Sequence, residues 1–173
     1  TRTEQADLFA AAFGSHGDSP KVVISVSNVE DCFYVPHVAR YLTEKLKTPV
    51  IIMSDYLISV SYRVLDKFKL SKLDDVNDIS DDILAQFDLN RLPDDIEMVK
   101  DNQSIPGEFD KMRRVTGLNT SSEGAVEYSP TINHRSHKVR NEKLHHVRRA
   151  SKLPELFGDN EGDLLIVGWG SCR

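Results

Sequence analysis

The stretch Lys21-Val-Val-Ile-Ser-Val26 decides the fold, together with a second apolar run at Thr48-Pro-Val-Ile-Ile-Met53. Short continuous apolar runs of this kind are typical of buried strands in a parallel sheet. Between the two runs, apolar residues recur at spacings of one, three or four, which predicts the inner face of a helix. These residues are Val29, Cys32, Phe33, Ala39, Leu42 and Leu46. Strand, helix and strand within about 30 residues predict a right-handed βαβ unit.

The central helix of this unit has a capping residue and an internal proline. Asn28 is the predicted N-cap, and the acidic Glu30 and Asp31 follow it at the positive end of the helix. Pro36 lies inside the helical pattern, so we expect a kink or a late helix start near it.

Another helix is expected before the first strand, over residues 3–13, with Thr3 as its N-cap. Residues 3–55 therefore predict the order helix, strand, helix, strand of a doubly wound parallel sheet. Ligands of such sheets bind at the carboxyl ends of the strands. Here those ends carry Ser27-Asn28 and Ser54-Asp55.

The overall composition narrows the class of protein. The chain has 173 residues, of which 39% are apolar and 28% charged, enough for a packed core and unlike a disordered chain. A formal net charge of −5 argues against a general nucleic-acid binder. Cys32 and Cys172 are too few for a disulfide scaffold, a Cys-ligated zinc site or an iron–sulfur cluster. Neither a membrane span nor a signal peptide is visible, so we expect a cytoplasmic protein.

The second half of the chain is more polar. Residues 56–69 lack a clear period, and residues 74–95 hold eight Asp and one basic residue, which predicts a solvated, flexible insertion. Residues 96–131 are rich in turn-forming residues. Residues 134–152 carry seven Lys or Arg and four His, which predicts a basic helix.

The last residues combine an apolar run with a glycine-rich turn. Residues 164–167 (Leu-Leu-Ile-Val) predict a strand buried on both faces, and Gly168-Trp-Gly-Ser-Cys172 predicts the entry to a helix, with Ser171 as a candidate cap. A buried parallel strand without a crossover helix lacks packing partners. We therefore expect the chain to be an interior piece of a longer polypeptide; the alternative is an edge strand that completes an existing sheet.

These patterns predict three parts. Residues 1–70 form an α/β half-domain, residues 71–157 an acidic insertion, extended linker and basic helix, and residues 158–173 the start of a C-terminal α/β domain.

Histidines of the predicted basic helix suggest a metal site. They are His134, His137, His145 and His146. Catalytic zinc needs three protein ligands and a supporting carboxylate, and the nearest carboxylate is Glu142. A solvated basic helix is the preferred interpretation, and we predict no metal site.

Other residues with reactive side chains are explained by structural roles and not by catalysis or metal binding. His16 and Asp18 lie on a glycine-flanked loop and are expected to be turn residues, because a catalytic histidine needs an oriented partner. Residues 74–82 lack the Gly and terminal Glu of a calcium loop. Residues 168–172 match neither a nucleophile elbow nor a phosphate loop. We predict no catalytic residue among them.

The first residues, Thr1-Arg2-Thr3-Glu4-Gln5, place two hydroxyls and a guanidinium at a helix start. Such a group can hold a carboxylate or phosphate through charge-assisted hydrogen bonds and backbone N–H groups. Helix capping and a solvated arginine explain the same residues.

Seven stretches of the chain, taken in order, resemble one protein family. They are Thr-Arg-Thr-Glu-Gln-Ala-Asp-Leu, Gly-Ser-His-Gly-Asp-Ser-Pro-Lys-Val-Val, Val-Glu-Asp-Cys-Phe, Thr-Pro-Val-Ile-Ile-Met-Ser-Asp, Arg-Val-Thr-Gly-Leu, Arg-Arg-Ala-Ser-Lys-Leu-Pro and Gly-Asp-Leu-Leu-Ile-Val-Gly-Trp-Gly-Ser. Their order resembles the α subunit of 2-oxoacid:ferredoxin oxidoreductases, most closely the 2-oxoglutarate branch. Asn119-Thr-Ser-Ser departs from it, since the family tends to have a Glu-His-Asp-Glu-like stretch there.

The resemblance implies a fold and an activity. Residues 1–70 would be the second half of the domain that receives the aminopyrimidine ring of thiamine diphosphate, and residues 163–173 would begin a transketolase-C-like domain. The enzyme would decarboxylate a 2-oxoacid, pass electrons through iron–sulfur clusters to ferredoxin and transfer the acyl group to coenzyme A. A separate β subunit would hold the pyrophosphate, Mg²⁺ and a cluster.

One substrate position carries over from the family. Thr1 matches a threonine that helps to hold the 2-oxoacid, and Arg2 follows it. A hydroxyl that donates there would be electrostatic stabilisation. The family's activating glutamate and its Gly-Pro-Ser-Thr segment lie upstream of Thr1, so we expect this chain to be inactive alone.

A second interpretation is a non-catalytic α/β interaction module that docks a partner through the acidic insertion and the basic helix. It predicts salt-sensitive association that does not depend on thiamine diphosphate.

Overall fold

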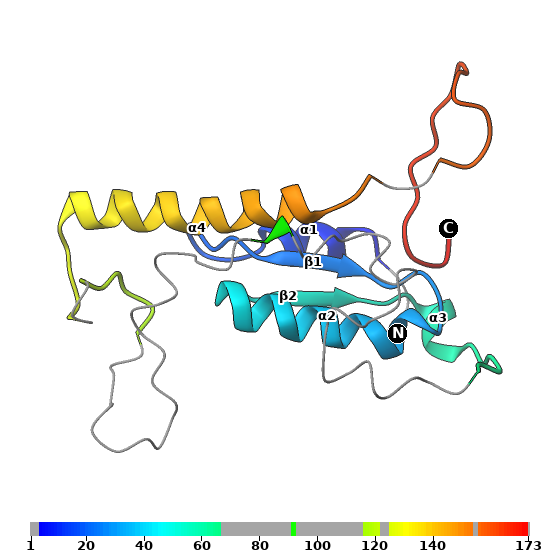
Figure 1. Ribbon diagram of the computed structural model, residues 1–173, viewed down its shortest axis with the longest axis horizontal. Coiled ribbons are helices and arrows are strands. Elements are labelled where there is room, and N and C mark those ends of the chain that lie inside the picture. The colour runs from blue at the N-terminus through cyan, green and yellow to red at the C-terminus, as the bar shows by residue number, and fades with distance from the viewer. Residues whose placement is uncertain (1–3, 67–90, 93–115, 122–124, 154–155, 173) are drawn as a thin grey trace.

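The computed structural model describes residues 4–66, 91–92, 116–121, 125–153 and 156–172. The elements in chain order are α1 (Ala6–Phe13), β1 (Val22–Ser25), α2 (Asp31–Leu46), β2 (Val50–Met53), α3 (Tyr56–Val60), α4 (Pro130–Ala150) and the 3₁₀ helix η6 (Gly170–Cys172) (Figure 1). The predicted cap Thr3, the predicted substrate residues Thr1 and Arg2, and nearly all of the acidic insertion of residues 74–95 lie outside the described residues.

The two strands form a parallel pair, as the apolar runs predicted. The register runs from Val22 opposite Val50 to Ser25 opposite Met53, and α2 makes the crossover. Val22 and Ile24 are buried, whereas the alternate residues of β1 are partly exposed. One face of β1 therefore carries the core, and the fold is a mixed α/β unit with a small parallel sheet.

Helix α2 begins where its capping residues close the turn after β1. The Asn28 Oδ1 accepts the N–H of Asp31 at 2.9 Å, but the N-cap position of α2 is Glu30 rather than the predicted Asn28, which closes the turn just before the helix. The late start expected near Pro36 is wrong, since α2 begins at Asp31 and continues through Pro36. Pro36 and Cys32, four residues before it, are both exposed, so the helical hydrogen bond that proline cannot donate is missing on the solvent side of α2.

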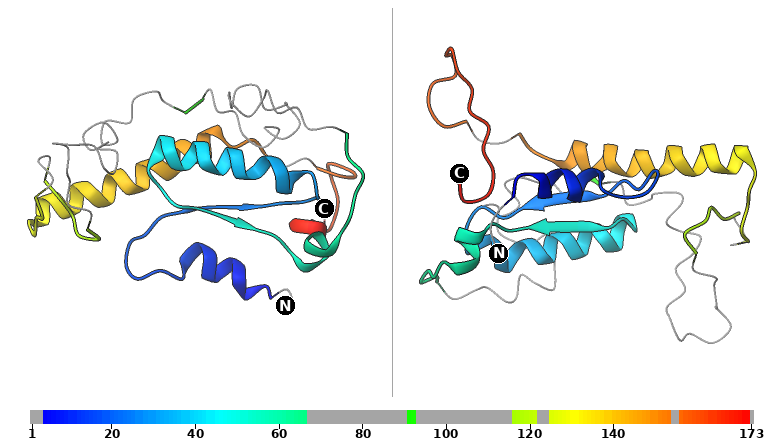
Figure 2. Two further views of the ribbon diagram at one scale, coloured as in Figure 1. Left: turned by 90° about the horizontal axis from the view of Figure 1, so that it is seen from below. Right: turned by 180° about the vertical axis from the view of Figure 1, so that it is seen from behind.

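The hydrophobic core lies between α2, β1 and the end of α4. Leu42 and Leu46 of α2 have no exposed surface, and Val147 and Ala150 of α4 belong to the same cluster. Helix α1 lies on the opposite face of the sheet from α2 (Figure 2). The N-terminal half of α4 extends past the amino ends of the strands (Figure 1). None of the helices in the described part has the length and apolar character needed to cross a membrane.

The strand predicted at residues 164–167 is wrong. These four side chains are 71–82% exposed and pair with no strand among the described residues. An apolar run becomes a strand only where a neighbouring strand takes its backbone hydrogen bonds, and the described part provides none at this place. The turn that follows is confirmed, because Gly170–Cys172 form η6.

Candidate functional site

Polar residues gather where both strands end, as the parallel topology predicted. Ser27 and Asn28 follow β1, Ser54 and Asp55 follow β2, and α3 begins directly after Asp55. Helix η6 and the N-terminal end of α1 lie at the same end of the molecule (Figures 1 and 2). We call residues 26–31, 54–59 and 170–172 the carboxyl edge.

The turn after β1 is closed by reciprocal hydrogen bonds. The Asp31 Oδ2 accepts the Ser27 N–H at 2.8 Å and the Ser27 hydroxyl at 2.6 Å, while Asn28 accepts from Asp31. The contact with Asn28 satisfies the N–H of Asp31, which has no partner within the helix because Asp31 is the first residue of α2. The turn therefore holds the backbone at the end of β1 in one conformation.

Asp55 joins two segments at the carboxyl edge. Its Oδ1 accepts the N–H of Ile58 at 2.9 Å and caps α3, and its Oδ2 accepts the N–H of Ser171 at 2.7 Å. The N–H of Ile58, and then the hydroxyl and the N–H of Ser171, hold the pKa of Asp55 below its ordinary value of 3.8. The contribution of this carboxylate to stability is therefore present above pH 3.8 and is lost as pH falls through the lowered pKa.

The two cysteines are exposed and unpaired by any disulfide in the described residues. Burial, and then the charge of Asp31, raise the pKa of the Cys32 thiol. A raised pKa leaves less thiolate at neutral pH, so Cys32 is not an activated nucleophile.

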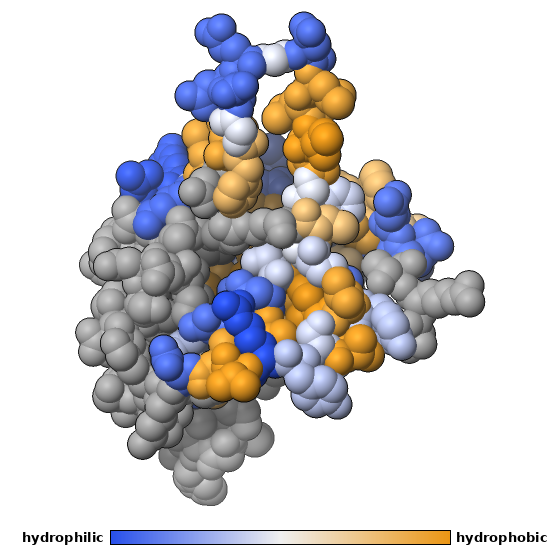
Figure 3. Space-filling view, turned by 90° about the vertical axis from the view of Figure 1, so that its right-hand side faces the viewer, coloured by the Kyte–Doolittle hydropathy of each residue, from blue (hydrophilic) through white to orange (hydrophobic). Residues whose placement is uncertain are grey.

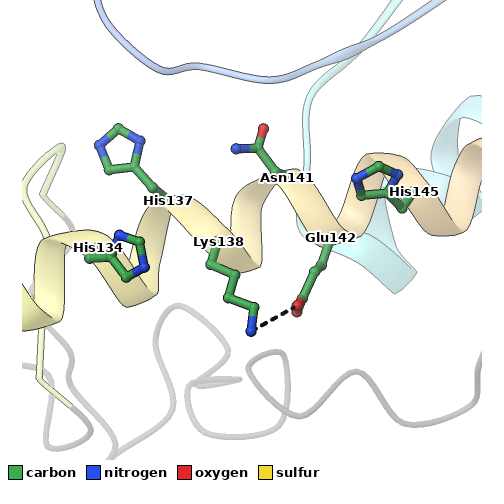
Figure 4. Close-up of a pocket in the computed structure, with 6 residues that line it drawn as sticks. All are labelled: His134, His137, Lys138, Asn141, Glu142 and His145. Carbon is green, nitrogen blue, oxygen red and sulfur yellow. Dashed lines mark ion pairs between the residues drawn. The ribbon is translucent and has the colours of Figure 1, made fainter.

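Three of the four histidines of α4, all but His146, line an open pocket of about 450 Å³ (Figure 4). Its lining residues are His134, His137, Lys138, Asn141, Glu142 and His145. Lys138 and Glu142 point toward each other as an ion pair at 3.9 Å, while His137 points away from them. Across the described ranges, no three His, Cys, Asp or Glu residues are placed to hold a metal ion.

Asp18 is more than the turn residue that the sequence indicated. Its Oδ2 lies 2.6 Å from the His137 Nδ1 and 3.2 Å from the Arg140 Nε, and so joins the loop before β1 to α4. Arg140 also donates to the Asn119 Oδ1 at 3.1 Å, and Asn119 donates to the Asn133 Oδ1 at 2.7 Å. These five residues, the Asp18 cluster, connect three segments that are distant in sequence. His16 is exposed on the same loop.

Replacing Asp18 with alanine is expected to loosen α4, because His137 and Arg140 lose their shared carboxylate. A partly exposed charge-assisted contact contributes about 1 kcal/mol, so amide exchange in the N-terminal half of α4 should rise about fivefold. Hydrogen exchange of the full-length protein measures this, with the exposed Asp66→Ala as control. Equal exchange rates in both variants would show that the cluster does not hold the helix.

Comparisons with known proteins support the resemblance. The chain is 29% identical over 178 residues to 2-oxoglutarate oxidoreductase subunit KorA of Mycobacterium tuberculosis, covering 99% of this chain and 26% of that protein. It is 26% identical over 180 residues to 2-oxoacid:ferredoxin oxidoreductase 1, subunit alpha, of Aeropyrum pernix, covering 100% of this chain and 27% of that protein. No known protein-family profile matches the chain.

A solved structure agrees with these relatives. It is the 2-oxoglutarate:ferredoxin oxidoreductase from Magnetococcus marinus with 2-oxoglutarate, coenzyme A and succinyl-CoA bound. It matches with a TM-score of 0.59 at 27% identity, over 91% of this chain and 27% of that chain. The chain thus spans about a quarter of the length of the relatives it matches.

Proposed function

We propose that this chain, a homologue of the α subunits of 2-oxoacid:ferredoxin oxidoreductases over nearly its whole length, forms part of a cytoplasmic enzyme of that activity. The enzyme oxidatively decarboxylates a 2-oxoacid, with 2-oxoglutarate as the favoured substrate, transfers the acyl group to coenzyme A and passes electrons to ferredoxin. The observation that carries this proposal is the continuous similarity, over 99% of the chain, to a 2-oxoglutarate oxidoreductase subunit.

Exposed apolar surface supports a role inside a larger assembly. Phe9 and Phe13 on α1 are 69% and 78% exposed, although their rings pack together with centroids 6.1 Å apart. Figure 3 looks onto the carboxyl edge and shows apolar surface there. Exposed apolar residues around this edge include Tyr56, Leu57, Val60 and Trp169. Patches of this kind mark contacts with other protein surfaces. We assign these contacts to other parts of the same polypeptide and to a β subunit.

The donor groups of the described residues do not fit Mg²⁺ or an iron–sulfur cluster. Asp31 and Asp55 already accept backbone N–H groups, and the two thiols fall short of the four that a cluster usually takes. We therefore assign the binding of Mg²⁺, of the iron–sulfur cluster and of the pyrophosphate of thiamine diphosphate to the β subunit. When bound, thiamine diphosphate supplies the electron sink for decarboxylation.

We assign substrate binding in this chain to Thr1 and Arg2. The position of the α1 N-terminal end at the carboxyl edge supports this, since ligands of parallel α/β sheets bind there (Figure 2). In this role, the Thr1 hydroxyl donates to an oxygen of the 2-oxoacid, and Arg2 neutralises a carboxylate.

The proposed activity is tested in the complete enzyme, consisting of the polypeptide that contains this chain and its β subunit. Under anaerobic conditions we expect ferredoxin reduction that requires both coenzyme A and 2-oxoglutarate, and that is slower with pyruvate. Faster reduction with pyruvate would contradict the substrate assignment. The absence of reduction with any 2-oxoacid, together with salt-sensitive association that ignores thiamine diphosphate, would favour an interaction module instead.

A further inference from the structure

Burial of the C-terminal segment is confined to one place among the residues described. Between residues 156 and 172, Gly170 is the one buried residue in the described part, while residues 164–167 are exposed. Helix η6 lies beside α3 at this point (Figure 1). Helix η6 is therefore the buried part of this segment, and its contacts with Asp55 can be followed atom by atom.

Asp55 provides the polar part of this contact. One carboxylate oxygen caps α3 through Ile58, and the other accepts the Ser171 N–H, 116 positions along the chain. Each oxygen has its own donor, so an asparagine, with a single acceptor oxygen, could replace only one of the two bonds.

Gly170 provides the steric part. Its φ of +68° favours glycine, and a Cβ at this position would lie 2.7 Å from the Asp55 Oδ2 and 3.8 Å from the Ser25 Oγ. A side chain would therefore push η6 away from the carboxylate. The end of β1 at Ser25, the second residue after β2 (Asp55) and the C-terminal segment meet at this point.

We propose that Asp55 is a positioning residue for the reaction, whose carboxylate holds Gly170 and Ser171 against the ends of β1 and β2. It acts through the backbone of η6, which closes one side of the carboxyl edge. This role rests on the proposed function, because the 2-oxoacid is held at the same edge. The low pKa of Asp55 supports it, since the carboxylate stays ionised at neutral pH.

The test compares four variants of the full-length protein in the complete enzyme: Asp55→Ala, Asp55→Asn, Gly170→Ala and the double variant Asp55→Ala/Gly170→Ala. Loss of a hydrogen bond to a charged group should speed amide exchange at Ser171 by about tenfold or more in Asp55→Ala. The kcat/KM for the 2-oxoacid should fall by a similar factor, because displaced groups no longer orient the substrate. The double variant should be little worse than the more severe single variant, since both remove the same contact.

Two controls separate this role from general damage to the fold. Gly162→Ala lies in the same segment, where an added Cβ meets open space, and should leave both readouts unchanged. Hydrogen exchange at α2 amides shows whether the Asp55→Ala variant is folded. If that variant is unfolded, Asp55→Asn replaces it in the comparison.

Three results would overturn the proposal. Unchanged exchange at Ser171 would refute the contact, and faster exchange with unchanged kcat/KM would refute the positioning role. If the wild-type enzyme turns over no 2-oxoacid, the proposed function fails and the positioning role fails with it. In that case the exchange data still show whether Asp55 holds η6.

Discussion

Leu42→Ala is expected to lower the free energy of opening of the α/β unit by about 3 kcal/mol. Leu42 has no exposed surface and lies in the core between α2 and β1. Alanine removes most of the buried side chain and leaves a cavity that the packed neighbours fill only in part. Hydrogen exchange of α2 and β1 amides in the full-length protein measures the loss locally.

The matched control for this variant is the next residue along α2. Thr43 is exposed, so Thr43→Ala should change the same free energy by less than about 0.5 kcal/mol. If Leu42→Ala were as mild as Thr43→Ala, the packing of α2 on β1 would be different from the packing described above.

Thr1→Ala is expected to lower kcat/KM of the complete enzyme for the 2-oxoacid by about a hundredfold, the usual effect of removing one donor to a developing negative charge. Arg2→Ala should act mainly on KM, because a guanidinium that binds the carboxylate does so equally in the ground state and the transition state. Steady-state kinetics with varied 2-oxoacid separates the two effects.

Thr3→Ala is the control for both substitutions. It removes the hydroxyl of the predicted helix cap, to which the resemblance assigns no substrate contact, so it should leave kcat and KM near the wild-type values. Similar kinetics for Thr1→Ala and Thr3→Ala would contradict the assignment of Thr1 to the substrate.

Local patterns predicted the βαβ unit but not every element around it. The apolar runs and the helical spacing between them were sufficient, because strand, crossover and strand are encoded in contiguous residues. Helix α3 was missed, since residues 56–69 show no clear period. The side chain of Asp55 before Tyr56 is the capping signal that could have found it.

The two most informative contacts could not have been found from local patterns. Asp18 meets Arg140 across 122 positions, and Asp55 meets Ser171 across 116. No spacing rule connects residues so far apart, and only the packing of α4 and η6 brings them together. The carboxyl edge itself was predictable, because parallel strands end on the same side of a sheet.

The prediction of function was based on the order of seven sequence stretches and not on any single motif. Composition excluded broad classes of protein, and the histidines of α4 gave a metal hypothesis that their geometry does not support. The roles proposed for Thr1 and Arg2 originate in the resemblance, since no local pattern distinguishes a substrate-binding threonine from a helix cap.

The central claim is that β1 and β2 belong to a larger sheet whose reactive centre is shared with a β subunit. An experimental structure of the complete enzyme with thiamine diphosphate and 2-oxoglutarate tests it most directly. We expect strands from outside residues 1–173 to extend the β1–β2 pair, with the aminopyrimidine ring at the carboxyl edge and the pyrophosphate on the β subunit. A two-stranded sheet that stands alone, with the cofactor bound elsewhere, would contradict the claim.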